Sequence, residues 1–339
     1  MALNKIGKRT MKLKNPPSIL GTYSIVGSKE GKGPLKEYFD EILEDDLVGT
    51  DSWEKAESKI QEDAMRRAID KTKLRLRDMD YLISGDLLNQ IVASGYAARQ
   101  LAIPFFGLYG ACSTMSESLA LAAMLIDGGF AENVICATSS HFSTAERQFR
   151  FPLEYAAQRE FSSQWTVTGS GSTILSSTGT GPYITYVTPG KIVDPGIKDV
   201  ANMGAAMAPA AMDTLINHFQ DTGFKPNDYD LIITGDLGLI GKSIVLDMMK
   251  KEGYDLTGVY TDCGAEIFDP KSQDTHAGGS GCACSAVVLN GYIIKEMKKG
   301  VFKRVLFLAT GALHSKLITQ QGESIPSIGH AITIDINKE

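Results

Sequence analysis

The segment Gly110-Ala111-Cys112-Ser113-Thr114 opens an apolar run that extends to Ile126, and part of it occurs twice in the chain. Ala111-Cys112-Ser113 is repeated as Ala283-Cys284-Ser285, again at the start of an apolar run. Two other strings are duplicated in the same order, Gly85-Asp86-Leu87 as Gly235-Asp236-Leu237 and Ala137-Thr138 as Ala309-Thr310. An internal duplication of this length predicts two similar half-domains, with a site where the halves meet.

Strand and helix signals alternate around the repeated strings. Apolar positions at helical spacing predict helices over residues 53–71, 93–101 and 115–126 in the first half, and over 207–219, 243–252 and 286–299 in the second. Short apolar runs predict strands at 82–83, 105–108, 134–137, 168–175, 231–233, 259–261, 305–308 and 327–334. We therefore expect an α/β fold of two halves, residues 1–185 and 186–339, with mixed sheets and two buried central helices.

The composition excludes several classes of protein. The 339-residue chain is 43% hydrophobic and 22% charged, as is typical of a globular protein, and its net charge of −6 argues against nucleic acid as a partner. No apolar run approaches the roughly 18 residues of a membrane-spanning helix, so we expect a soluble chain. The five cysteines show no disulfide framework and no zinc-binding spacing, which indicates a reducing compartment and no metal site. No nucleotide-binding motif is present, and we expect no cofactor.

A duplicated α/β unit with a cysteine at the mouth of a buried helix resembles the thiolase-like superfamily of thiolases and β-ketoacyl synthases, which implies a five-layered fold. The chain is also similar to one branch, the stage V sporulation protein AD family, in six strings: Gly-Asp-Leu-Leu-Asn-Gln (85–90), Gly-Ala-Cys-Ser-Thr (110–114), Ala-Thr-Ser-Ser-His (137–141), Thr-Ala-Glu-Arg-Gln-Phe-Arg (144–150), Met-Ala-Pro-Ala-Ala (207–211) and Ala-Gly-Gly-Ser-Gly-Cys-Ala-Cys-Ser (277–285).

That resemblance implies a function. It implies binding of dipicolinic acid, alone or with calcium, for its uptake into the developing bacterial spore, and a part in its release at germination. It also implies partners among the membrane proteins of the same spore transport system. The chain is then expected to be peripheral at the inner membrane of the developing spore, and the thiolase-like relatives suggest a homodimer.

Cys112 falls where the thiolase-like enzymes keep their nucleophile. A thiol in the first turn of a helix faces the free amide groups of that turn, which lower its pKa and favour the thiolate. Alternatively, cysteine is a small apolar side chain that fills a tight turn, and Cys284 stands at the matching place in the second half. The residues leave both interpretations open, and the resemblance favours Cys112 as a residue that lines a pocket.

The partners that such a cysteine needs for catalysis are missing. The condensing enzymes that resemble this chain supply His or Asn from two loops, but here the loops read Thr234-Gly235-Asp236-Leu237-Gly238 and Gly279-Ser280-Gly281-Cys282. Only His276 lies near as a substitute. Without that pair, the usual means of stabilising an oxyanion and moving a proton are absent. We expect a non-catalytic binding protein; the alternatives are a Cys112-dependent acyltransferase or condensing enzyme, and a purely structural subunit.

Dipicolinate is a planar aromatic dianion, so its site needs donors for two carboxylates and a flat apolar wall. We expect the ligand to be bound by six residues: Cys112, Ser113, Thr114, His141, Arg147 and Ser280. Arg150 is an alternative to Arg147 as the cation, and Phe142 or Phe149 is the expected apolar wall. These arginines and phenylalanines belong to a segment, residues 139–158, that we expect to be a loop. The arginines have a structural alternative, ion pairs with Glu146 or Glu154. Asp86 and Asp236 are either calcium ligands or caps of the helices that follow them.

Overall fold

The computed structural model describes residues 4–149 and 159–338, in which two runs of strands follow matching orders. The first run is β3 (Ser18–Val26), β9 (Gly169–Ser176), β7 (Asn133–Ser140), β5 (Tyr81–Gly85) and β6 (Phe105–Gly107); the second is β10 (Tyr183–Thr188), β15 (Ser327–Asp335), β14 (Arg304–Ala312), β11 (Leu231–Thr234) and β12 (Tyr260–Asp262). In each run the last three strands are parallel and the others antiparallel, so both sheets are mixed, as predicted. Tyr183 pairs with Ser18 and joins the two runs.

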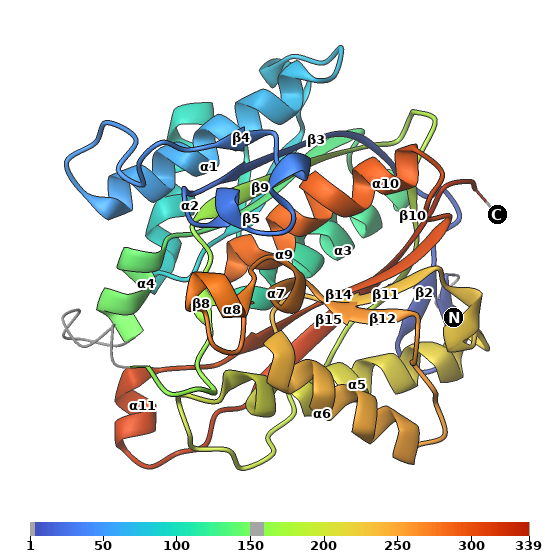
Figure 1. Ribbon diagram of the computed structural model, residues 1–339. Helices are drawn as coiled ribbons and strands as arrows, with labels where there is room; N and C mark the ends of the chain where they lie inside the picture. Colours follow the sequence, from blue (N-terminus) through green and yellow to red (C-terminus); the bar gives the residue numbers. More distant parts are fainter. Residues whose placement is uncertain (1–3, 150–158, 339) are drawn as a thin grey trace.

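Helices form three layers around these sheets (Figure 1). The outer layers are α1 (Trp53–Asp70) with α2 (Val92–Leu101) on the first run, and α5 (Met203–Thr222) with α6 (Gly238–Lys251) on the second. Between the sheets lie α3 (Thr114–Asp127) and α9 (Cys282–Val288), the latter continued by a π-helical turn (Leu289–Ile293) and α10 (Ile294–Lys298). Because α3 contacts β5 and β7 on one side and β14 and β15 on the other, the two halves share one core.

The composition of the central helices explains why they lie between two sheets. α9 is buried along its whole length, and in α3 Met115, Leu119 and Ile126 are buried while Leu121 and Met124 are exposed. A helix that is apolar all round, as α9 is, has no face for solvent and is stable only when it is enclosed. The sheet approaches α9 closely, because a Cβ on Gly171 of β9 would lie 2.5 Å from the Ala286 carbonyl oxygen. Glycine at position 171 therefore permits this contact.

Several elements differ from the sequence-based expectations. Residues 142–149 form a helix, α4 (Phe142–Phe149), where a loop was expected. The second half also contains two short helices and a short strand that were not expected: α7 (Cys263–Glu266), α8 (Pro270–Gln273) and β13 (Gly279–Ser280). Strand β13 pairs with β8 (Trp165–Thr166). The short strands β1 (Lys5–Ile6), β2 (Thr10–Lys12) and β4 (Glu41–Ile42) extend the sheet, and α11 (Lys316–Gln320) follows β14. The expected boundary at 185/186 falls inside β10.

Candidate functional site

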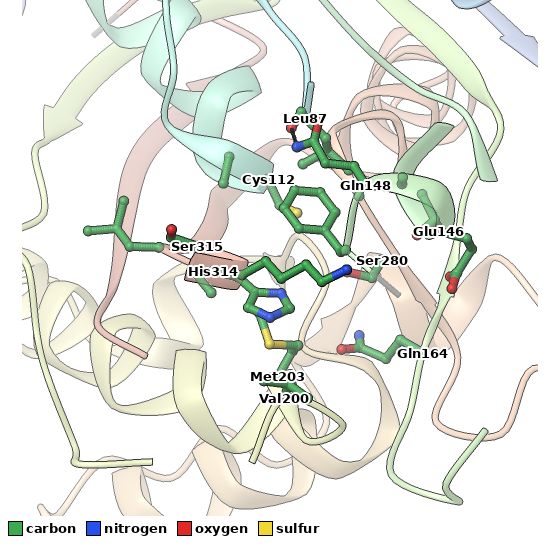
Figure 2. A pocket seen from close by; sticks show the side chains of 18 of the residues that line it. Leu87, Cys112, Glu146, Gln148, Gln164, Val200, Met203, Ser280, His314 and Ser315 are labelled. Atoms are coloured by element: carbon green, nitrogen blue, oxygen red, sulfur yellow. Dashed lines mark hydrogen bonds between the residues drawn. The ribbon is translucent and has the colours of Figure 1, made fainter. Parts of the chain in front are cut away.

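A pocket of about 680 Å³ lies where the two halves meet, and both halves contribute to its lining. Its inner part is formed by Cys112, Asp236 and Ser280, which come from the turn before α3, the loop after β11, and β13. Figure 2 shows Cys112, Ser280 and His314 around the same space, with Met203 and Val200 beside His314. The pocket therefore brings together side chains that are far apart in the sequence.

The turn that carries Cys112 is held tightly against the second half. Ala111 adopts a left-handed conformation with φ of 51°, which is uncommon for a residue other than glycine. The Cys282 thiol donates to the Ala111 carbonyl oxygen at 3.0 Å. A Cβ on Gly311 of β14 would lie 2.3 Å from the Gly110 carbonyl oxygen, so glycine at position 311 lets the turn and the strand touch. These contacts fix the direction in which the Cys112 side chain points.

Asp236 is a buried carboxylate at the floor of the pocket, surrounded by hydrogen-bond donors. The Thr310 hydroxyl donates to its Oδ1 at 2.9 Å and the Ser280 hydroxyl to its Oδ2 at 3.0 Å. The Cys112 thiol and the Gly281 amide are further donors. Burial raises the pKa of Asp236 to about 6, while these hydrogen bonds favour the charged form and oppose the rise. This carboxyl therefore titrates close to neutral pH.

The surroundings of Cys112 oppose the thiolate. Its hydrogen bond with Cys282, its burial and the neighbouring Asp236 carboxylate raise the pKa of the Cys112 thiol well above its usual value. The expectation that the helix terminus lowers this pKa is wrong, because the α3 amides near Cys112 are used within the turn and a carboxylate lies beside the sulfur. The Ser113 amide donates to the Gly110 carbonyl, and the Thr114 amide donates to the Ala111 carbonyl. A neutral thiol is a poor nucleophile.

The same turn also occupies the side chains of Ser113 and Thr114. The Ser113 hydroxyl donates to the Gly110 carbonyl oxygen at 2.7 Å, and the Thr114 hydroxyl donates to the Ala111 carbonyl oxygen at 2.6 Å. Both residues are buried and neither lines the pocket. Their observed role is to close the first turn of α3, in place of the predicted ligand contact.

The predicted cations of the first half also lie away from the pocket. His141 is buried between β7 and α4, where its Nε2 contacts the Asp46 carbonyl oxygen at 2.8 Å and burial lowers its pKa. Arg147 points to the side of α4, where it pairs with Glu54 and lies over the Trp53 ring. It lines a separate shallow hollow. The alternative cation Arg150 and its possible partner Glu154 lie outside the described residues.

Asp86 has the capping role that was the alternative to calcium binding. Its carboxylate accepts from the Leu88 amide at 2.8 Å and from the Ser94 amide at 2.7 Å, so it fixes the connection from β5 to α2. Asp236, the equivalent residue in the second half, is the one that reaches the pocket. Within residues 4–149 and 159–338, no group of three or more His, Cys, Asp or Glu side chains is arranged to hold a metal ion.

Sequence reasoning missed the residues on the opposite side of the pocket. Phe149 of α4, which was one of two candidates for the wall, stacks on His314 with ring centroids 5.4 Å apart and an angle of 20° between the planes. His314 and Lys316 follow β14 and line the pocket. The repeat gave only an approximate signal for His314: His141 comes directly after β7, and His314 comes two residues after the end of the equivalent strand β14.

Comparisons with known proteins agree with this architecture. Residues 7–335 match the family described as Stage V sporulation protein AD. The chain is 46% identical over 329 residues to Stage V sporulation protein AD of Bacillus subtilis (strain 168), and the match covers 97% of each protein.

Solved structures with a similar fold are condensing enzymes. One is 3-oxoacyl-[acyl-carrier-protein] synthase III from Aquifex aeolicus VF5, with a TM-score of 0.58 and 12% identity over 94% of this chain and 99% of that one. Another is a variant of Xanthomonas campestris OleA, with a TM-score of 0.60 and 14% identity over 96% of this chain and 98% of that one. At this identity they show the fold alone, which is thiolase-like as predicted. The sequence matches establish more, namely that the chain belongs to the stage V sporulation protein AD family.

Proposed function

We propose that this protein binds dipicolinic acid in the pocket beside Cys112 and leaves it chemically unchanged, for uptake into the developing spore and release at germination. Membership of a sporulation protein family supports the biological setting. The observation that carries the proposal is a pocket between the halves whose lining combines the aromatic rings of Phe149 and His314 with the basic side chain of Lys316. A planar aromatic dianion matches both features.

The wall and the cations come from two short segments. The stacked rings of Phe149 and His314 both line the pocket, and the ring of an aromatic ligand packs favourably against such side chains. Lys316 supplies a positive charge, and the His314 ring supplies an N–H donor. Charge-assisted hydrogen bonds from such groups are the strong interactions available to a carboxylate. Cys112 and Ser280 then form the floor against which the ligand lies.

Binding should depend on the pocket lysine and not on the nearby arginine. We expect calorimetric titration with dipicolinic acid to show saturable binding, about tenfold weaker for Lys316→Ala and within about twofold of wild type for Arg147→Ala. Each variant removes one cation, but only Lys316 lines the pocket. Titrations with and without calcium show whether the metal contributes. Loss of binding in Arg147→Ala with retention in Lys316→Ala would place the ligand elsewhere, and no binding by wild type would defeat the proposal.

The alternative, a condensing enzyme, predicts covalent chemistry on Cys112. We expect none, because the pKa of the thiol is raised and Gly235 and Ser280 stand where a condensing enzyme needs His or Asn. After incubation with a panel of acyl-CoA thioesters, mass spectrometry should find no lasting adduct on Cys112. A stoichiometric adduct on this residue, accompanied by turnover, would establish the enzyme and overturn our assignment.

Delivery of the ligand requires other proteins in this proposal. No helix among residues 4–149 and 159–338 has the length and apolarity to cross a membrane. We propose that membrane proteins of the same transport system receive the ligand and hold this chain at the inner membrane of the spore. Fractionation of sporulating cells should then find it released from membranes when those proteins are deleted. Retention that resists a high-salt wash would contradict this.

A further inference from the structure

We propose that Asp236 selects the charge state in which a dicarboxylate is bound: the ligand enters the pocket together with one proton, and Asp236 holds that proton in the complex. This inference rests on the proposed function and adds to it a defined coupling between ligand and pH. It follows from a count of hydrogen atoms at the floor of the pocket and from the charges that face it.

The floor has donors, but in the ionised site their hydrogens are already used. The Ser280 hydroxyl carries a single hydrogen and donates it to the Asp236 carboxylate, and the single hydrogen of the Cys112 thiol is shared between the Cys282 sulfur and Asp236. The Thr310 hydroxyl, behind them, donates to the same group. An incoming carboxylate is an acceptor only, so it would meet the floor with no hydrogen available and with a like charge beside it.

A single proton on Asp236 removes both obstacles. The protonated carboxyl becomes a donor, and a hydroxyl that has been donating to it can accept from it instead. The hydrogen of Ser280 or Cys112 is then free to turn to the ligand carboxylate. The proton comes from solvent and is returned when the ligand leaves, so no other reactant is needed. The negative charge next to the ligand is neutralised in the same step.

The other buried ionisable groups around Asp236 cannot take its place as the group that gains the proton when the ligand binds. The thiols of Cys112, Cys263, Cys282 and Cys284 all have raised pKa values and stay protonated through neutral pH. Asp262, behind Asp236, has a pKa raised by burial to about 7, but it does not line the pocket. Its oxygens accept from Thr234 and from the amides of residues 237 and 238.

Within the described ranges 4–149 and 159–338, four ionisable groups face the pocket besides Cys112 and Asp236. They are Tyr109, whose raised pKa keeps it neutral, Lys316, Glu146 and His314. Glu146 and His314 are the alternative sites for the proton that is taken up, because a dianion beside either one would also favour its protonated form. Variants that remove each titration separately distinguish these groups from Asp236.

The coupling has a definite sign. The Asp236 carboxyl of the free protein has a pKa of about 6, and a neighbouring anion raises it further. Above pH 6 the complex therefore holds more protons than the free protein. Affinity must fall as pH rises through this window, by at most about tenfold per pH unit, and it levels off above the pKa of the complex.

The test is calorimetry with dipicolinic acid between pH 6 and 8, in phosphate and in Tris, since the difference in heat between the buffers measures proton uptake. We expect wild type to take up close to one proton per ligand near pH 7. Asp236→Asn should take up almost none, should bind with little dependence on pH, and at pH 8 should bind about tenfold tighter than wild type. Glu146→Gln and His314→Gln should retain the uptake and the pH dependence, and thermal unfolding shows that each variant is folded.

The possible failures are distinguishable. Proton uptake that persists in Asp236→Asn and disappears in His314→Gln or Glu146→Gln would assign the proton to His314 or Glu146. That result would overturn the inference and leave the proposed function intact. Wild-type binding with no uptake and no pH dependence would overturn it as well. Absence of binding at every pH would remove the proposed function and the inference with it.

Discussion

Cys112→Asp should reduce dipicolinic acid binding by at least about 100-fold without unfolding the protein. The thiol lines the pocket beside the buried Asp236 carboxylate. A second carboxylate at this point adds negative charge where an anionic ligand must approach, and it also fills part of the floor. Calorimetric titration at pH 7 measures the loss, and thermal unfolding shows whether the variant retains its fold.

Two control variants separate charge from shape. Cys112→Asn has nearly the shape of Cys112→Asp but no charge, so it should bind more tightly than the aspartate variant. Cys112→Ser keeps a small donor next to Asp236 and should bind within a few-fold of wild type. Equal affinity of Cys112→Asp and wild type would show that the ligand lies outside this pocket.

Asp262→Ala should destabilise the protein by about 3 to 5 kcal/mol. Asp262 is fully buried, and its two oxygens accept from the Thr234 hydroxyl at 2.7 Å and from the amides of Leu237, Gly238 and Ala265 at 2.9, 2.8 and 3.2 Å. Alanine leaves the buried amides of Leu237 and Gly238 without their acceptor, and each such group carries a desolvation penalty. Urea unfolding followed by circular dichroism measures the change in free energy.

The matched control is Asp255→Ala. Asp255 is exposed and accepts from Thr257 within a turn, from its amide at 2.9 Å and from its side chain. Its loss should cost less than about 1 kcal/mol, because water can replace the acceptor. If Asp262→Ala were no more destabilising than Asp255→Ala, the turn after β11 would not depend on this carboxylate. Asp262→Asn, which keeps one acceptor oxygen, should fall between the two.

The sequence predicted the regular part of the fold well, because each element there has its own periodic signal. The apolar run after Cys112 predicted α3, and its copy after Cys284 predicted the helix that begins with α9. Helix α4 has Phe142, Ala145 and Phe149 at helical spacing, but over only eight residues, and the segment was assigned to a loop. Long-range contacts also hold this helix, including the Thr144 hydroxyl bonded to Glu57 and the Phe142 ring stacked on Trp165. Contacts of this kind cannot be read from local spacing.

The site was predictable only in part for a related reason. Cys112 and Asp236 lie within repeated strings, and Ser280 lies within one of the two loops compared with the condensing enzymes. The structure places all three in one pocket. His141 and Arg147 satisfied the same chemical criteria, but the fold turns them to other partners. Position along a strand says which end of the sheet a residue occupies. It does not say toward which neighbour the side chain turns.

The internal repeat has a consequence for the evolution of the site. Cys112 and Cys284 occupy equivalent positions, yet Cys284 is enclosed in the shared core while Cys112 opens into the pocket. Asp86 and Asp236 have diverged in the same way, one into a cap and the other into the pocket floor. The two copies therefore contribute different parts to one pocket. Duplication supplied symmetry to the scaffold, and each member of a pair could then change independently, because only one of them lines the pocket.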